Sequence, residues 1–172
     1  NITFICGGNM ASAMIGGLLQ QGNSPENLAV AEINADRRTQ LQHQFGINAS
    51  TTVAEAGVNC DICVLAVKPQ QLRAVVTENA TFLRNKLVIS IAAGIRATDL
   101  CIWLDNQSAI IRAMPNTPCL IGKGVTGLYA LPEVDGSQKK QAASILGAVG
   151  SVIWCDDESQ LDAVTAMSGS GP

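Results

Sequence analysis

The first fourteen residues, NITFICGGNMASAM, constrain the fold of this chain most strongly. Ile2 to Cys6 is a short apolar run, and Gly7-Gly8 follows directly. From Asn9 to Gln21 the apolar side chains recur at helical spacing, and Gly22 stands where a helix would stop. Strand, glycine turn and helix in this order are the arrangement that binds a dinucleotide pyrophosphate, because unpaired amides at the helix start point at the phosphates.

The glycine loop departs from the common fingerprint at its first position. The pattern G-x-G-x-x-G/A falls on Cys6 to Ala11, so that Cys6 replaces the first glycine. Gly8 would let the phosphates approach the backbone, and Ala11 would let the helix pack near the strand. A plain glycine turn between a buried strand and any helix is the alternative. We expect Cys6 to disfavour the tight turn and Cys6→Gly to tighten coenzyme binding.

The second predicted strand, Leu28 to Ala31, ends in an acidic residue, Glu32. A ribose-binding carboxylate is expected about twenty residues beyond the glycine loop, which is where Glu32 lies. Such a carboxylate accepts the ribose hydroxyls of NAD and repels the 2′-phosphate of NADP. Asn34, Arg37 and Arg38 follow, and the arginines either hold that phosphate by charge-assisted hydrogen bonds or form a solvated helix face. The sequence leaves the choice between NAD and NADP open.

The composition fits one globular domain that contacts small molecules. Of the 172 residues, 47% are hydrophobic and 15% are charged, which is enough to bury a substantial core. The net charge of −3 and the lack of a basic cluster argue against nucleic acid and anionic membranes as partners. No apolar run is as long as a membrane span and the chain opens on a strand, so we expect a cytoplasmic protein without a signal peptide.

The cysteines and the single histidine do not indicate a metal site. Cys60 and Cys63 form a C-x-x-C that leads into the apolar run at 62–67, but there is no second such pair. With His43 as the only histidine, four zinc ligands are hard to assemble, and no cysteine–histidine catalytic set is evident. A redox role for the pair is conceivable, but thiols in a core or at a strand edge are much more common. We expect no metal.

Strands and helices alternate along the rest of the chain. Apolar runs predict strands at 47–50, 62–67, 87–91, 109–113, 124–130 and 151–154, separated by helices at 36–45, 52–57, 70–78, 98–104 and 136–149. Thr98 is the predicted N-cap of its helix. The pattern predicts an α/β, Rossmann-like, doubly wound and mainly parallel sheet with helices on both faces. Its ligand crevice would lie beyond the carboxyl ends of the strands, where the glycine loop, Glu32, 67–69, 92–94 and Asn116 fall.

Five motifs occur in a fixed order, namely GGNMA (7–11), AVKP (66–69), SIAAG (90–94), IRAMPNTP (111–118) and SGSGP (168–172). With them the chain resembles the cofactor-binding part of pyrroline-5-carboxylate reductase. The resemblance implies hydride transfer from NADPH or NADH to the C=N bond of 1-pyrroline-5-carboxylate, giving L-proline as the last step of proline biosynthesis. The alternatives are another imine or β-hydroxyacid reductase with the same cofactor domain, and a nucleotide-binding module without chemistry.

The resemblance also implies roles by position, most of them for main-chain groups. The pyrophosphate would lie against Cys6, Gly7, Gly8, Asn9, Met10 and Ala11, and the adenosine ribose against Glu32 and Asn34. The cofactor would be lined by Ala66, Val67, Lys68, Pro69, Ala92, Ala93 and Gly94, with Met114 and Pro115 bordering the nicotinamide. Asn116 would be the catalytic residue that orients the nicotinamide, since an amide both donates and accepts. For Lys68, an exposed strand-end lysine is the alternative.

The resemblance divides the chain into an NAD(P)-binding domain at 1–155 and, at 156–172, the start of the linker or helix leading into a C-terminal helical dimerisation domain that is absent from this chain. It implies a homodimer or larger homo-oligomer for the intact protein, and a chain that alone binds coenzyme weakly with negligible turnover. Leu161, Val164 and Met167 form an apolar stripe after the acidic cluster at 156–158. Without further helices we expect this stripe to be exposed or loosely packed.

Overall fold

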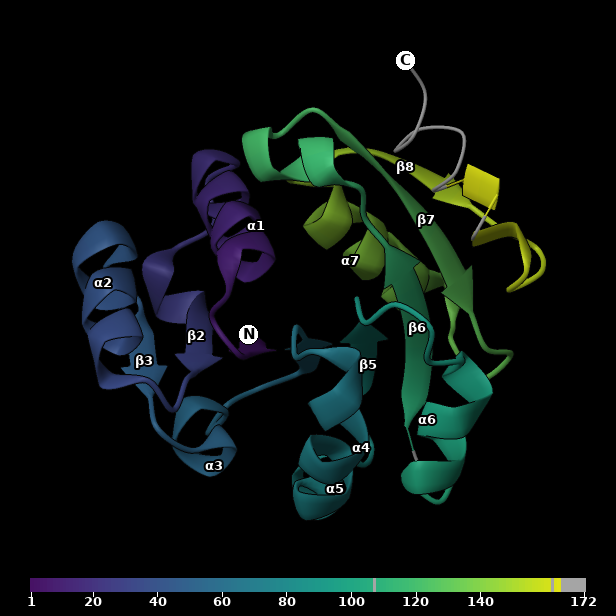
Figure 1. The fold of residues 1–172 in the computed structure, drawn as a ribbon, viewed down its shortest axis with the longest axis horizontal. Helices are drawn as coiled ribbons and strands as arrows, with labels where there is room; N and C mark the ends of the chain where they lie inside the picture. The colour runs from purple at the N-terminus through teal and green to yellow at the C-terminus, as the bar shows by residue number, and fades with distance from the viewer. Residues whose placement is uncertain (107, 162, 165–172) are drawn as a thin grey trace.

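A computed structural model describes residues 1–106, 108–161 and 163–164 of the chain, and its centre is an eight-stranded sheet (Figure 1). The strands lie in the order β3-β2-β1-β4-β5-β6-β7-β8. Their bounds are β1 (Ile2–Ile5), β2 (Leu28–Ala31), β3 (Asn48–Ser50), β4 (Ile62–Leu65), β5 (Leu87–Ser90), β6 (Ala109–Met114), β7 (Gly124–Ala130) and β8 (Gly150–Trp154). The α-helices are α1 (Asn9–Gln20), α2 (Ala35–Phe45), α3 (Val53–Ala56), α4 (Pro69–Glu78), α5 (Ala80–Leu83), α6 (Ala97–Trp103) and α7 (Gly136–Gly147). Two 3₁₀ turns complete the elements, η1 (Pro25–Asn27) and η2 (Thr117–Ile121).

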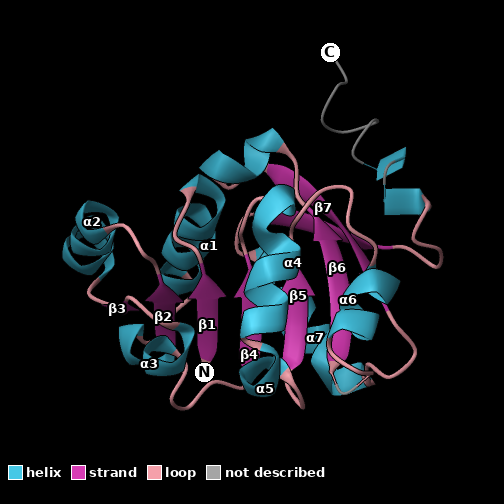
Figure 2. Cartoon of the chain, turned by 60° about the horizontal axis from the view of Figure 1, so that its bottom comes forward, coloured by secondary structure: helices cyan, strands magenta, loops and turns pink. Residues whose placement is uncertain are grey.

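Neighbouring strands from β3 to β6 pair in parallel, so their carboxyl ends meet at one edge of the sheet. Ile5 of β1 lies opposite both Ala31 of β2 and Leu65 of β4, and Leu65 lies opposite Ser90 of β5. Figure 2 shows the arrowheads of β1, β4, β5 and β6 on the same side of the molecule. Within the part of the chain that the structure describes, only β7 and β6 pair antiparallel, and β8 then runs parallel to β7. The predicted Rossmann-like, mainly parallel sheet is confirmed.

Helices cover both faces of the sheet, and each face has its own apolar core. On one face Met14 of α1, Leu41 of α2 and Ile145 of α7 pack around Phe4 of β1. The cluster on the other face includes residues of α3, α4, α5 and α6, among them Leu72. Because both faces are covered, the central strands are apolar at nearly every position, as in β4, where all residues are buried.

The predicted helix start at Thr98 is wrong. The N-cap of α6 is Arg96, and Ala97 is already the first helical residue. The amide of Ala97 donates a hydrogen bond to Oε2 of Glu158 at 2.8 Å, and Glu158 lies 61 positions further along the chain. A distant carboxylate thus replaces the local hydroxyl cap, which is why a local reading of the sequence misplaced the start.

The segment after β8 is docked on the sheet rather than loose. Leu161 is fully buried in a small cluster with Met114 and Cys155, so the expectation that it is exposed or loosely packed is wrong. Glu158 also forms a partly buried ion pair with Arg112 of β6, with 2.9 Å between Oε2 and the guanidinium nitrogen. Met167 and the SGSGP motif at 168–172 lie outside the described residues.

Candidate functional site

The turn after β1 adopts the conformation for which the first glycine of the fingerprint is normally used. Cys6 has a φ of +79°, in the left-handed region that favours glycine, and its amide donates to Ala31 O at 2.8 Å. The tight turn therefore forms with cysteine in place, at the cost of backbone strain of about 1 kcal/mol.

Helix α1 begins at the carboxyl edge of the sheet without a side-chain cap. Its N-cap is Gly8, whose carbonyl accepts the amide of Ser12 at 2.9 Å. The amides of Asn9, Met10 and Ala11 belong to the first turn, where a helix has no internal acceptor for them. A Cβ added at Gly8 would meet no atom within 4 Å, so the backbone is open to a ligand here. Open amides at a helix start favour an anion, because the helix dipole adds to their positive charge.

Glu32 is buried, with 8% of its surface exposed, and its carboxylate braces the glycine loop. Oε1 accepts the amide of Gly7 at 3.0 Å, and Oε2 accepts the amide of Asn34 at 3.0 Å. Both oxygens thus join the turn after β1 to the turn after β2. The position agrees with that expected of a ribose-binding carboxylate, but a ribose would have to share oxygens that already accept main-chain amides.

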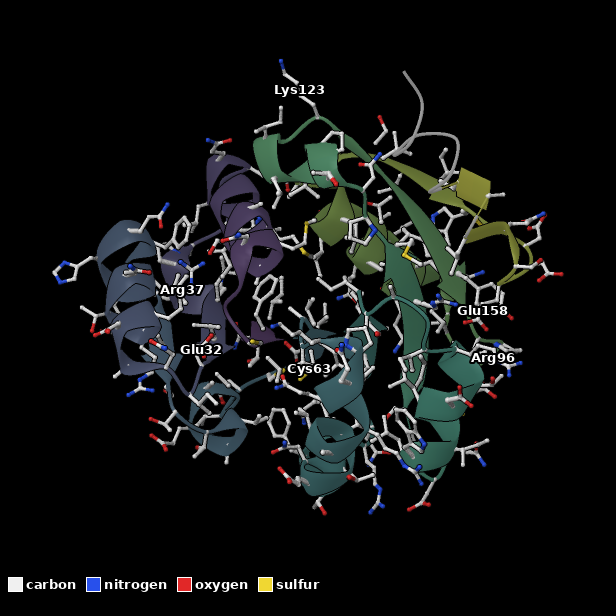
Figure 3. All side chains as sticks on the ribbon, in the orientation of Figure 1. Glu32, Arg37, Cys63, Arg96, Lys123 and Glu158 are labelled. Carbon is white, nitrogen blue, oxygen red and sulfur yellow. The ribbon has the colours of Figure 1, made fainter. Side chains whose placement is uncertain are left out.

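The two arginines of α2 are half-buried: Arg37 contacts the glycine loop, and Arg38 contacts the turn after β2. Arg37 donates from Nε to Gly7 O and from its terminal nitrogen to Ser12 Oγ, each at 2.5 Å. Arg38 donates to the carbonyls of Glu32 and Ile33 at 2.8 and 2.9 Å. Figure 3 shows Arg37 above Glu32 at the side of the site. The Glu32 carboxylate and the two arginine side chains therefore lie close together, between the end of β2 and the first turn of α2.

Among the described residues, two cavities at this edge share Cys6 and Glu32. The first, of about 420 Å³, is lined by Cys6, Gly7, Gly8, Glu32, Asn34, Asp36, Arg37 and Gln40. The second, of about 300 Å³, is more apolar, and its lining includes Ile33, Val53, Val67 and Val75. Sequence reasoning missed the second cavity. Its signal is Ile33, an apolar residue directly after a buried strand, whose side chain is 84% exposed.

The loops after β4 and β5 reach the same edge, as predicted. Ala66 donates its amide to Ile5 O at 3.0 Å, which holds the start of the loop after β4 beside the glycine loop. In that loop Val67 is buried, while Lys68 is exposed, and Pro69 is the first residue of α4. In the loop after β5, Ala92 is buried, Ala93 and Gly94 are exposed, and Gly94 has a φ of +77°.

Asn116 follows β6 at this edge, but its side chain also has a folding role. The residue is 6% exposed, and its Oδ1 accepts the amide of Val125 at 2.9 Å, so it fixes the start of β7. Among the residues that the structure describes, none accepts a hydrogen bond from Asn116 Nδ2. Of its neighbours, Met114 is buried against Leu161 and Pro115 is half-buried. A role in orienting a nicotinamide stays a prediction, and it would fall to Nδ2.

Within the described ranges, no three histidine, cysteine, aspartate or glutamate side chains gather in a way that could hold a metal ion. None of the helices in those ranges has the length and apolar character needed to span a bilayer.

Comparison with known proteins defines the class first. The model of the family described as NADP oxidoreductase coenzyme F420-dependent matches residues 1–94, and the chain belongs to this family. The matched part contains the glycine loop, Glu32, both arginines and the loops after β4 and β5.

The individual proteins that the chain resembles are pyrroline-5-carboxylate reductases. It is 44% identical over 172 residues to the one from Pseudomonas aeruginosa, covering 99% of this chain and 63% of that protein. The solved structure from Coxiella burnetii is 41% identical with a TM-score of 0.96, covering 100% of this chain and 64% of the other. The structure from Plasmodium falciparum, described with NADP bound, is 29% identical with a TM-score of 0.86 over 100% and 63% of the two chains. The chain thus spans somewhat less than two thirds of these relatives.

Proposed function

We propose that the whole protein is a pyrroline-5-carboxylate reductase, which transfers a hydride from NADPH or NADH to the C=N bond of 1-pyrroline-5-carboxylate and yields L-proline. The observation that carries the proposal is the open start of α1 beside the glycine loop, in a chain 44% identical to a protein of that name. When bound, the reduced nicotinamide supplies the hydride, and the residues of this chain hold and orient it.

The residues at the carboxyl edge fit such a coenzyme from end to end. The amides of Gly8 to Ala11 would take the pyrophosphate, since the helix start has no side-chain cap and the backbone at Gly8 faces open space. The apolar cavity with Ile33 and Val67 would take the adenine. The loops at 66–69 and 92–94 would continue along the coenzyme toward Met114, Pro115 and Asn116, which would border the nicotinamide.

The contacts at the ribose position support either coenzyme. Glu32 places a carboxylate there, which opposes a 2′-phosphate, while Arg37 and Arg38 supply two positive charges in the same turn. If Arg37 holds the 2′-phosphate, Arg37→Ala should weaken NADPH binding about tenfold more than NADH binding, given the strength of charge-assisted hydrogen bonds. Equal losses for the two coenzymes would assign Arg37 to bracing the loop alone.

Residues 1–155 would form the coenzyme-binding unit, with the docked turn at 156–161 continuing from it. The homo-oligomer implied by the resemblance stays a prediction, as does the substrate, 1-pyrroline-5-carboxylate.

Steady-state kinetics of the full-length protein test the proposed reaction. Purified protein is mixed with NADPH or NADH, and loss of the reduced coenzyme is followed with and without 1-pyrroline-5-carboxylate. We expect oxidation that depends on this substrate and is stoichiometric with L-proline. Coenzyme binding without any substrate-dependent oxidation, with both coenzymes, would overturn the proposed reaction and leave a nucleotide-binding module.

A further inference from the structure

The C-x-x-C pair lies at the edge of the sheet opposite to the coenzyme cavities. Cys63 is the second residue of β4, labelled in Figure 3, and Cys60 lies two residues before that strand begins. The first residue of β4, Ile62, pairs with the first residues of β1 and β5, so Cys60 is at the amino edge. The two sulfur atoms are 3.4 Å apart, and both thiols are free.

The two thiols differ in access and in acidity. Cys63 is fully buried, whereas Cys60 is half-buried and lines a cavity of about 170 Å³ at the surface. The hydrogen bond between the two thiols lowers the pKa of Cys60 to about 6, against the effect of burial and with further lowering by hydrogen bonding to Thr3 and by the charge of Lys86. The same hydrogen bond and burial raise the pKa of Cys63. A partly accessible thiol of lowered pKa thus lies in contact with a fully buried thiol.

We propose that Cys60 and Cys63 form a dithiol site that exchanges reversibly with small-molecule disulfides, Cys60 as the attacking thiol and Cys63 as the resolving thiol. The sulfur atoms are 3.4 Å apart and need to approach by about 1.4 Å to reach the length of a disulfide bond.

The exchange has two balanced steps. The Cys60 thiolate attacks one sulfur of the external disulfide, which forms a mixed disulfide and releases one thiolate. Cys63 then gives its proton to the first released thiolate and attacks the Cys60 sulfur, which closes the bond between them and releases the second thiolate, and this thiolate takes up a proton from water. Two protein thiols are oxidised and the external disulfide is reduced to two thiols.

The dithiol site lies apart from the residues proposed to bind the coenzyme. The cavities at the carboxyl edge share no residue with the cavity at Cys60. We therefore expect coenzyme affinity to change less than twofold between the reduced and the oxidised protein, so failure of either proposal leaves the other testable.

Equilibration of the intact, folded protein in mixtures of reduced and oxidised glutathione tests the proposal. Free thiols are blocked by alkylation, and the disulfides are located by peptide mass mapping. Wild-type protein should form a Cys60–Cys63 disulfide, which lowers its mass by two hydrogen atoms. Excess reduced glutathione should reduce this disulfide again. Cys63→Ala should stop at a mixed disulfide of Cys60 with glutathione, and Cys60→Ser should leave Cys63 unmodified. Cys101→Ser, a change at a cysteine outside the pair, is the matched control and should behave as wild type.

The pH profile of Cys60 alkylation separates a coupled pair from two thiols that merely lie close. In wild-type protein the rate should rise with a midpoint near 6, and in Cys63→Ala the midpoint should move upward because the donor to the thiolate is lost. A disulfide that forms only in urea, or a Cys60 midpoint near the ordinary thiol value in wild-type protein, would overturn the proposal. The wild-type results decide even if Cys63→Ala fails to fold.

Discussion

The turn after β1 and the turn after β6 lie on the same edge of the sheet, but they use their polar groups in opposite ways. After β1, the side chain of Glu32 accepts the loop amide of Gly7, while the first amides of α1 stay free of any side-chain cap. After β6, the side chain of Asn116 accepts the amide of Val125 and closes the turn onto β7. The turn after β1 is held by a side chain from the turn after β2, and its backbone stays open to a ligand. The turn after β6 is held by its own Asn116 side chain, which fixes the start of β7.

Gly124→Ala should give the largest effect, because the turn after β6 has no room for another atom. The added Cβ would lie 2.0 Å from Cys119 Sγ and 2.6 Å from Asn116 Oδ1. We expect a loss of about 3 kcal/mol in the free energy of unfolding, measured in urea. Gly136→Ala, where a Cβ meets nothing within 4 Å, is the control and should change it by less than about 0.5 kcal/mol. Equal stability of the two variants would mean that the turn is not closed.

Asn116→Ala should lower the free energy of unfolding by about 2 kcal/mol, because it leaves the partly buried amide of Val125 without its acceptor. Asn34→Ala is the matched change in the turn after β2, where an exposed Asn accepts the amide of Arg37 at 2.9 Å as the N-cap of α2. Asn34→Ala should lower the free energy of unfolding by about 1 kcal/mol. If thermal unfolding shows equal losses, burial is not what makes the Asn116 hydrogen bond important.

Gly8→Ala should harm binding and leave the fold intact, the reverse of Gly124→Ala. The new methyl group would stand on the open surface where a pyrophosphate is proposed to lie, so coenzyme Kd should rise about tenfold, which is about 1.4 kcal/mol. Fluorescence titration with NADPH measures this, and Gly147→Ala in α7 is the control. Unchanged affinity would place the pyrophosphate elsewhere.

Cys6→Gly should give the smallest effect, a gain of about 0.5 kcal/mol in stability. Relief of strain at a φ of +79° contributes about 1 kcal/mol, and the greater freedom of glycine in the unfolded chain offsets part of it. The fold itself holds Cys6 in this conformation, so the gain should appear in unfolding rather than in the coenzyme affinity suggested by the sequence. Cys6→Ala keeps the strain and should show no gain. A tighter coenzyme Kd in Cys6→Gly would show that cysteine distorts the loop before binding.

Local patterns in the sequence were sufficient for the strands, most helices and the edge at which they gather. Each of these elements depends on residues within one short window, such as the apolar run of β4 or the glycine loop before α1. From the parallel alternation it followed that the glycine loop, Glu32 and the loops after β4 and β5 share one edge.

The features that the sequence did not predict all depend on contacts between distant residues. Glu158 caps α6 from 61 positions away, and Arg37 reaches Ser12 across 25 positions. The folding role of Asn116 depends on where β7 returns, which no periodicity near Asn116 indicates. The apolar cavity beside Ile33 likewise needs α4 to be placed against β2 before it exists.

The contact between Glu158 and the first amide of α6 makes that amide a reporter. While the acidic turn after β8 is docked, Ala97 N–H is engaged by its carboxylate. Any event that lifts this turn from the sheet would release the proton of Ala97 to exchange with solvent deuterium, so the exchange of one amide in α6 would report the undocking of the acidic turn after β8.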